Sequence, residues 1–255
     1  MTIKTYLSII ALFLLWNAGT AQNFKFSDIS IDELEMKEDS LFPKVDAIVL
    51  HRDVYAQVGQ YVEVYEKIKI LSEEGLDYAT MEFPFYDVFK IKGNTFNLVN
   101  GSIQKTKLTK DMIFTDKIKD NGRILEDKKV SFPKVKVGSV IEIHYKASKG
   151  SASDIDMQYD IPIKKLTIEV LNGTVSTYRF VQNPRAYIKV SRKDTNTKVY
   201  LSSTNVPPLE HENYVYDMDL YRAKLIMRRL GYNKSPKFAT WEDIPKLLYN
   251  VDDFA

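Results

Sequence analysis

The sequence contains no cysteine. A thiol nucleophile, a disulfide framework and a lipid-modified lipoprotein cysteine are therefore excluded, because each of them needs a cysteine sulfur. An excess of charge of one sign is also absent, since 36 Lys and Arg residues stand against 34 Asp and Glu residues and the formal net charge is +2. Binding to nucleic acid or to anionic lipid usually needs clustered basic residues. We expect no nucleic-acid partner.

Long apolar runs are lacking as well, apart from one at the N-terminus. Residues 1–21 contain Lys4, an apolar core over residues 7–16 and the small-residue end Ala18-Gly19-Thr20-Ala21, which is the pattern of a secretory signal peptide. The core is shorter than the roughly 20 residues of a membrane span, although an uncleaved anchor stays open as an alternative. Loss of Lys4 lowers the net charge from +2 to +1. We predict an exported protein, periplasmic or secreted, that begins near Gln22 and has no membrane span after cleavage.

The rest of the chain is dominated by short alternating patterns. Over residues 62–70, Val62, Val64, Ile68 and Ile70 alternate with polar or aromatic residues, which is the period-2 signature of a half-buried strand. A turn at residues 72–75 then predicts a hairpin with a second strand over residues 78–83, which Pro84 ends. A long hairpin with one apolar face needs a second sheet to cover it.

Other segments give roughly ten short strands with turn signals between them. The Asn100-Gly101 dipeptide is the strongest hairpin signal, because a type I′ turn wants φ > 0 at both central residues. Residues 117–129 are charged and predict a mobile surface loop. No long helical period intervenes, so the predicted fold is all-β: a large antiparallel β-sandwich, supersandwich-like. The other expected strands cover residues 46–50, 95–99, 102–108, 140–147, 159–161, 166–171, 178–181, 187–191, 199–203 and 220–230.

A short helix is expected at each end of this sandwich. Ser30 and Glu33 fit a capping box and predict a helix over residues 31–37. Thr240 fits a helix cap, and the next residues place an apolar stripe on one helical face. We expect this stripe to be an interaction surface made by Trp241, Ile244, Leu247 and Leu248. The predicted organisation is a signal peptide (1–21), a lead-in with a short helix (22–45), the β-sandwich domain (46–232) and a linker helix toward a missing downstream domain (233–255).

Several polar groups are candidate sites, and a structural interpretation is favoured for each. His51, His144 and His211 are too far apart in sequence for a local zinc motif. Asp154, Asp156 and Asp160 suggest a calcium loop but alternate with apolar residues and lack the glycine that an EF-hand needs. Asp217 and Asp219 are expected on a solvated face, and Ser139 is expected to be a turn serine outside any nucleophile elbow. We therefore predict no catalytic, cofactor-binding or metal-binding residue.

The order of these motifs resembles the β-rich domain of unknown function that precedes a transglutaminase-like core in exported proteins of Gram-negative bacteria. The resemblance runs from about residue 24 to residue 254, and residues 240–254 resemble the linker helix that leads into that core. It implies a downstream transglutaminase-like domain, or another envelope protein, as the partner. The Cys, His and Asp machinery of that core has no counterpart here. The matching segments are residues 46–50, 68–71 with Gly75 and Ala79, 95–98, 100–101 with 107–108, 132–133 with 138–142, 159–162 and 221–223.

The expected function is a non-catalytic exported module that interacts with a partner or positions a neighbouring catalytic domain, with no cofactor. The alternative is a free-standing carbohydrate-binding or cell-envelope binding module, in which Tyr and Phe side chains stack on sugars. The single Trp outside the signal segment weakens this alternative. A hydrolase with its own site ranks third.

Overall fold

The computed structural model describes residues 26–83, 88–120, 123–148, 154–171, 176–183, 185–186, 188–210 and 213–232. The predicted signal peptide and the predicted C-terminal helix, with Trp241, Ile244, Leu247 and Leu248, lie outside these residues. No helix within the described ranges is long and apolar enough to cross a membrane.

The described part is mostly β-strand, as predicted. Its helical elements are α2 (Ile31–Glu35) and the 3-10 turns η1 (Glu74–Ala79), η2 (Lys110–Met112) and η4 (Met218–Leu220). Its strands are β1 (Ala47–Gln57), β2 (Tyr61–Ile70), β3 (Thr80–Phe83), β4 (Val88–Val99), β5 (Ser102–Lys107), β6 (Ile113–Asp120), β7 (Arg123–Ser131), β8 (Val140–Ser148), β9 (Asp154–Asp156), β10 (Ile163–Leu171), β11 (Ser176–Gln182), β12 (Ser191–Asp194), β13 (Lys198–Val206) and β14 (Lys224–Tyr232).

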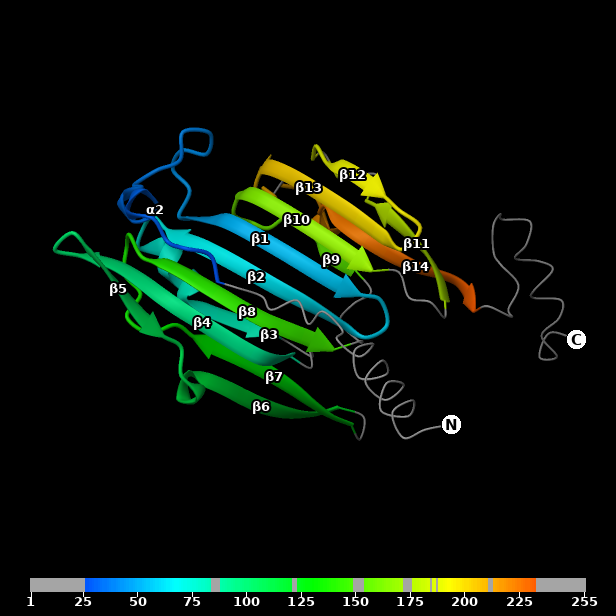
Figure 1. Ribbon diagram of the computed structural model, residues 1–255, viewed down its shortest axis with the longest axis horizontal. Coiled ribbons are helices and arrows are strands. Elements are labelled where there is room, and N and C mark those ends of the chain that lie inside the picture. Colours follow the sequence, from blue (N-terminus) through cyan, green and yellow to red (C-terminus); the bar gives the residue numbers. More distant parts are fainter. Residues whose placement is uncertain are drawn as a thin grey trace, which may run out of the picture.

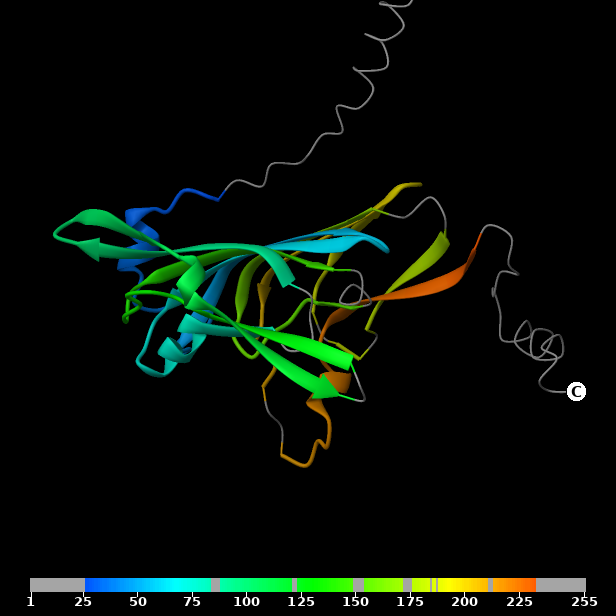
Figure 2. The ribbon, with the colours of Figure 1, turned by 90° about the horizontal axis from the view of Figure 1, so that it is seen from below.

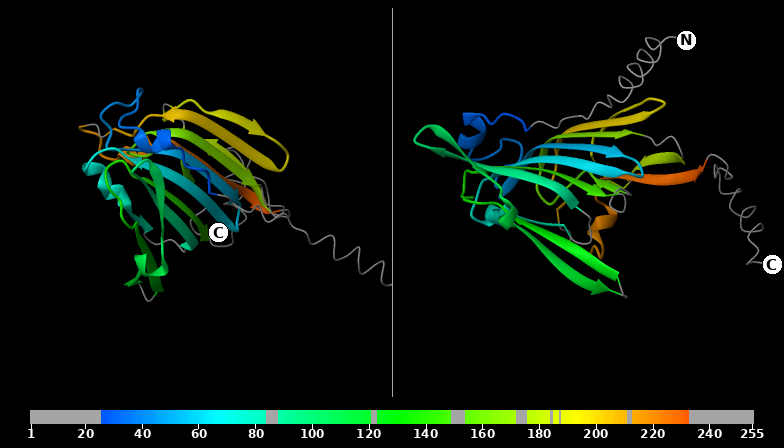
Figure 3. Two further views of the ribbon diagram at one scale, coloured as in Figure 1. Left: turned by 60° about the vertical axis from the view of Figure 1, so that its left-hand side comes forward. Right: turned by 60° about the horizontal axis from the view of Figure 1, so that its bottom comes forward.

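The strands form one large sheet and two small ones. The large sheet has the order β12-β13-β10-β1-β2-β8-β4-β5, and the small sheets have the orders β11-β14-β9 and β3-β7-β6 (Figure 1). Both small sheets lie on one side of the large sheet, and α2 lies on the other (Figures 2 and 3). This sandwich-like arrangement confirms the predicted fold class. The sheet is not wholly antiparallel, however, because β1 and β10 pair in parallel. A parallel pair needs a long crossover, and here the chain from β2 to β9 supplies it.

Two local turn predictions are confirmed. Ser30 Oγ accepts the backbone N–H of Glu33, and the Glu33 carboxylate accepts the backbone N–H of Ser30, which completes the capping box of α2. Asn100 and Gly101 have φ values of 51° and 74° and join β4 to β5. In both cases the side chains or the backbone freedom of the turn residues determine the structure locally, without help from distant contacts.

The predicted hairpin between β2 and the segment of residues 78–83 is wrong. β2 pairs with β1 on one edge and with β8 on the other, so neither edge is left for β3. The turn after β2 is tied instead to Asp46, whose carbonyl oxygen accepts the backbone N–H groups of Leu71 and Ser72. From there η1 leads the chain into the second layer, where β3 pairs with β7. The position of the turn was predicted correctly, but the strands that pair with β2 were not.

Several other boundaries differ from the predictions. Residues 117–129 are not a loop, because β6 and β7 form a hairpin there. Residues 114–117, in the first half of β6, are all exposed. This part of the strand therefore has no alternation of apolar and polar residues from which a strand could be predicted. β1 runs on to Gln57 instead of ending at Leu50, and β12 begins only at Ser191. Residues 159–161 form no strand.

Strand β2 is buried on both faces, although the alternating pattern predicted burial on one. Every residue from Val62 to Ile70 is buried. The face toward the second layer, called here the inner face of the large sheet, carries Val62, Val64 and Ile68. The opposite or outer face is covered by the lead-in segment, residues 26–36, whose Leu34 packs with Phe96 and Val140. Two coverings, one on each side, thus account for the burial of the whole strand.

Candidate functional site

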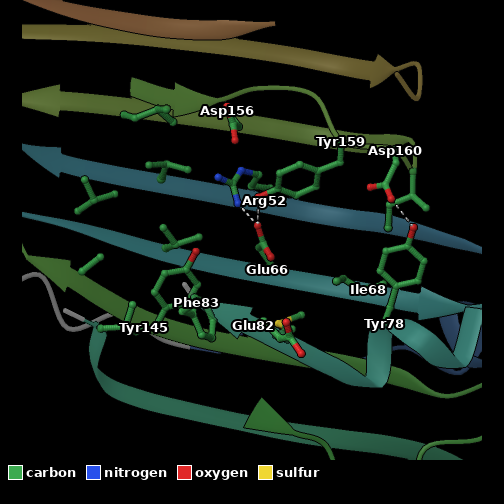
Figure 4. A pocket seen from close by; sticks show the side chains of 18 of the residues that line it. Arg52, Glu66, Ile68, Tyr78, Glu82, Phe83, Tyr145, Asp156, Tyr159 and Asp160 are labelled. Atoms are coloured by element: carbon green, nitrogen blue, oxygen red, sulfur yellow. Dashed lines mark hydrogen bonds and ion pairs between the residues drawn. The ribbon is translucent and has the colours of Figure 1, made fainter. Parts of the chain in front are cut away.

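A cleft of about 400 Å³ lies on the inner face of the large sheet (Figure 4). Side chains of β1, β2 and β8 form its floor, and residues of β3 and β9 line it from the second layer. Small-molecule and cofactor sites usually enclose roughly 300–1,000 Å³. The cleft is therefore large enough to be a binding site, and we call it the inner cleft.

A buried ion pair lies on the floor of the inner cleft. Arg52 of β1 and Glu66 of β2 face each other across the two strands, and their side chains are 6% and 8% exposed. The Tyr159 hydroxyl donates a 2.6 Å hydrogen bond to Glu66 Oε1, and the Arg52 guanidinium carbon lies 4.8 Å from the centroid of the Tyr159 ring. Burial raises the pKa of the Tyr159 hydroxyl, so this group remains a donor. The guanidinium is thus held by both charge and aromatic contact.

One donor of this pair is unused. Arg52 Nε is buried and has no hydrogen-bond acceptor among the described residues. A buried N–H without an acceptor costs about 1–3 kcal/mol relative to a satisfied group. Such a group in a cleft marks a place where an acceptor from outside the chain would be stabilised.

Aromatic side chains form much of the cleft wall. Phe83 at the end of β3 and Tyr145 of β8 pack edge to face, with ring centroids 4.8 Å apart. Tyr78 in η1 donates a 3.1 Å hydrogen bond to Asp160 Oδ2, which links the β3 side of the cleft to the segment after β9. Burial also raises the pKa of the Tyr78 hydroxyl. These rings add apolar surface beside the ion pair on the floor.

The described lining of the inner cleft is acidic. Arg52 is its single basic residue, and its carboxylates belong to Glu66, Glu82, Asp154, Asp156 and Asp160. Basic partners stand behind two of these groups, since Lys129 Nζ is 2.7 Å from Glu82 and Lys224 Nζ is 4.0 Å from Asp156. Partial burial nevertheless raises the pKa of Asp156, and Lys224 opposes this shift. The electrostatics favour a ligand with positive charge.

Two sheet edges line the same cleft. β3 and β9 are each the last strand of a small sheet. The Ala79 carbonyl accepts the Phe132 N–H, and the Met157 N–H donates to the Ala223 carbonyl. Because hydrogen bonding alternates along an antiparallel pair, the backbone groups of Glu82 and of Asp156 point away from their paired strands. Within the part of the chain that the structure describes, each edge therefore has backbone donors and acceptors without a strand partner.

The outer face also buries polar groups, but the lead-in segment covers them. Lys67 Nζ lies 2.9 Å from Glu33 Oε1, and Lys69 Nζ donates to the carbonyls of Leu34 and Gly138 at 2.7 and 2.6 Å. Burial lowers the pKa of Lys69 to about 8. These bonds hold the lead-in segment against the outer face.

A second buried network lies beside these lysines. Tyr65 and Asn94 donate to the two oxygens of Glu142 at 3.2 and 2.6 Å, and Tyr65 also bonds Ser27 Oγ at 2.6 Å. Burial raises the pKa of Glu142. His144 Nε2 lies 2.7 Å from Glu63 Oε1, and burial lowers the pKa of His144. All of these contacts hold strands to one another or to the lead-in segment.

The structure separates the polar residues that the sequence offered as candidate sites. His51 and His144 lie on the outer face and His211 lies outside the described residues; among the described residues no group of three or more His, Asp or Glu side chains could hold a metal ion. Asp217 caps η4, and Asp219 pairs with Arg222 at the surface. Ser139 is buried, donates to Asn97 Oδ1 at 2.6 Å and accepts the Lys136 N–H, as expected of a turn serine.

The sequence indicated Asp154, Asp156 and Asp160 as candidate site residues, but not the other polar and aromatic residues that line the same cleft. Arg52, Glu66, Tyr78 and Tyr159 were not identified. One signal was available, because Glu66 interrupts the apolar face formed by Val62, Val64 and Ile68. A charged residue on the buried face of a strand needs a buried partner. The identity of that partner depends on strand register, which the sequence pattern did not supply.

Comparison with known proteins places the fold but not an activity. The sequence profile of DUF3857, a domain of unknown function with a solved structure, matches residues 58–210. No curated protein matches the chain. Among solved structures, a proposed protease from Parabacteroides distasonis is similar at a TM-score of 0.54 and 14% identity, over 71% of this chain and 40% of that one. Native yeast LTA4 hydrolase is similar at a TM-score of 0.36 and 11% identity, over 71% and 29%.

Proposed function

The chain belongs to the DUF3857 family, and on that premise we propose that it is a non-catalytic, exported module that binds or positions a partner. The observation that carries the proposal is the inner cleft, which combines aromatic walls, an acidic lining and a buried, unused donor. No Ser, Thr, His or Lys side chain lines its described part. A nucleophile of the Ser-His, Thr or Lys type therefore has no member there.

In this proposal, the partner is a further domain of the same, longer polypeptide. The chain spans 40% of the length of the Parabacteroides distasonis protein it resembles, so this fold occurs in that protein beside other material. We infer that the module acts as the N-terminal accessory domain of a transglutaminase-like protein. The experiment is to express the chain together with a cysteine-containing domain encoded downstream in the same reading frame. Stable association supports the proposal, and a reading frame without such a domain removes this form of it.

The same proposal includes export. Residues 1–21 have the features of a signal peptide, with Lys4 before an apolar core and Ala21 at the end. N-terminal sequencing of the protein from the periplasm or the medium is expected to give Gln22. A chain that begins at Met1 in the membrane fraction would replace export with anchoring.

Absence of catalysis is tested directly. The exported chain is assayed against chromogenic peptide and acyl-transfer substrates, and we expect no turnover above buffer. The contradicting result is turnover that Asp156→Asn abolishes and Glu38→Gln leaves intact. Asp156 is chosen because it lines the inner cleft with a raised pKa, and Glu38 because it is exposed in the N-terminal segment.

One observation favours carbohydrate binding as a second function. Tyr214 and Tyr216 are fully exposed, and Tyr200 and Tyr221 are partly exposed. Exposed aromatic rings stack on sugars. Affinity electrophoresis through peptidoglycan fragments tests this function, with Tyr214→Ala/Tyr216→Ala as the disrupting variant and Phe114→Ala, another exposed ring, as the control. Retardation lost only in the tyrosine variant would favour the carbohydrate function.

A further inference from the structure

We propose that the inner cleft binds an extended polypeptide segment with a lysine or arginine side chain, and that this segment lies along the β3 or β9 edge as an added strand. The inference rests on the proposed binding function and names the chemical class of the partner. Three features of the described residues carry it, and each restricts the ligand in a different way.

The first feature is the pair of strand edges. Glu82 of β3 and Asp156 of β9 direct backbone groups away from β7 and β14, and residues of both strands line the same cleft. An open edge is satisfied best by another strand, because a strand presents donors and acceptors at the same spacing. A ligand with a regular peptide backbone therefore fits this cleft better than a compact small molecule.

The second feature is the charge of the lining. Five carboxylates face one guanidinium, and that guanidinium is already paired with Glu66. The remaining carboxylates repel an acidic peptide and attract an ammonium or guanidinium group. Phe83 and Tyr145 provide aromatic surface for the aliphatic part of such a side chain and for its charge.

The third feature is the unused donor of Arg52. Its Nε is buried, and the Arg52 side chain lines the cleft at 6% exposure. The missing acceptor must be an oxygen that the acidic lining does not repel. A peptide carbonyl is such an acceptor, because it is strong but carries no net charge. A basic peptide thus supplies a carbonyl for Arg52, a backbone for the edges and a cation for the carboxylates.

The test is isothermal titration of the exported chain with three heptapeptides, each acetylated and amidated. The first alternates valine and lysine, the second replaces every lysine by glutamate, and the third carries N-methyl groups on alternate backbone nitrogens of the lysine peptide. We expect the lysine peptide to bind at least about tenfold more tightly than either of the others. N-methylation removes the N–H groups that pair with an edge, so it separates strand addition from charge attraction alone.

The protein variants are Glu82→Lys and Glu38→Lys, which make the same charge change inside and outside the cleft. The Glu82 side chain is 66% exposed, so its replacement is compatible with folding. We expect Glu82→Lys to weaken the lysine peptide at least about tenfold and Glu38→Lys to weaken it less than about twofold. Equal loss in both variants would mean general charge attraction and would overturn the proposed site.

Two further results would overturn the inference: equal affinity for the lysine and glutamate peptides, and full affinity for the N-methylated peptide. Neither result concerns catalysis or attachment to a larger protein, so the broader binding function would survive them. Cleavage of the lysine peptide during the titration would instead contradict the proposed function itself.

Discussion

The two faces of strand β2 bury charged groups in opposite ways. On the outer face, Lys69 donates to the carbonyls of Leu34 in the lead-in segment and of Gly138 in the turn before β8. On the inner face, Glu66 pairs with Arg52, and Arg52 Nε has no acceptor among the residues that the structure describes. Both faces of the strand are buried, but Arg52 is the residue whose buried donor lines the inner cleft.

This difference separates a structural role from a binding role. A buried charge that is fully partnered inside the chain holds its elements together and has no capacity for a ligand. A buried charged group that has an unused donor can gain a hydrogen bond when a ligand supplies the acceptor, and this bond favours binding. We therefore assign the outer face to stability and the inner face to recognition, and substitutions on each face can test that division.

The largest effect is expected from Arg52→Met. The substitution leaves the Glu66 carboxylate buried with no opposite charge, which costs about 3–5 kcal/mol of unfolding free energy. Urea unfolding measures this loss. The double variant Arg52→Met/Glu66→Met removes both charges and should recover most of it. Equal stability of the single and double variants would contradict this prediction, because it would show that an unpaired Glu66 carboxylate costs nothing at this position.

A smaller effect is expected on the outer face from Tyr65→Phe. Glu142 loses a donor and Ser27 loses its contact with the sheet, which should lower the unfolding free energy by about 1.5 kcal/mol. Tyr78→Phe is the matched control, because its bond to Asp160 is exposed and should be worth about 0.5 kcal/mol. A loss at Tyr78 as large as that at Tyr65 would contradict the assignment of stability to the outer face.

The third prediction concerns pH and Lys69. Its folded-state pKa is lowered to about 8 by burial, against 10.5 for the ordinary side chain. Between these values the unfolded chain binds the proton and the folded chain does not, so the unfolding free energy should rise with pH in this window. Lys69→Met should flatten that rise in urea titrations at pH 8 to 10.5. A wild-type profile that falls in the same window would contradict the buried-amine interpretation.

The smallest effect is expected from Asp156→Asn. Its raised pKa means that the folded state holds the proton more tightly, so stability is highest below the unfolded pKa and is lost as the pH rises through the folded pKa. The variant should be more stable than wild type above about pH 4. Because the side chain is 45% exposed, we expect a gain within about 0.5 kcal/mol. A destabilised variant at pH 7 would mean that the pairing with Lys224 dominates instead.

The sequence predicted those parts of the fold that depend on local chemistry. The capping box at Ser30 and the turn at Asn100 were found because neighbouring residues satisfy their own backbone. The partner of β2 was not found, because a period-2 pattern shows which side chains share a face and not which strand lies beside them. The hairpin of β6 and β7 was missed for a related reason, since the exposed first half of β6 lacks an apolar alternation.

The inner cleft was only partly predictable. Asp154, Asp156 and Asp160 stood out as an acidic cluster, and all three line the cleft. Their aromatic neighbours come from β3 and β8, and Arg52 faces Glu66 only because β1 and β2 pair in one particular register. A shift of one residue would turn Glu66 to the other face. The site is therefore a product of register and layer packing, which the sequence pattern does not specify.

The central claim is that a peptide binds along the strand edges of the inner cleft and not at the lead-in segment on the outer face. Hydrogen exchange of backbone amides, with and without the lysine heptapeptide, tests it most directly. We predict slower exchange in β3 and β9, at residues 80–83 and 154–156, with no change over residues 26–36. Protection of the lead-in segment with unchanged β3 and β9 would contradict the account.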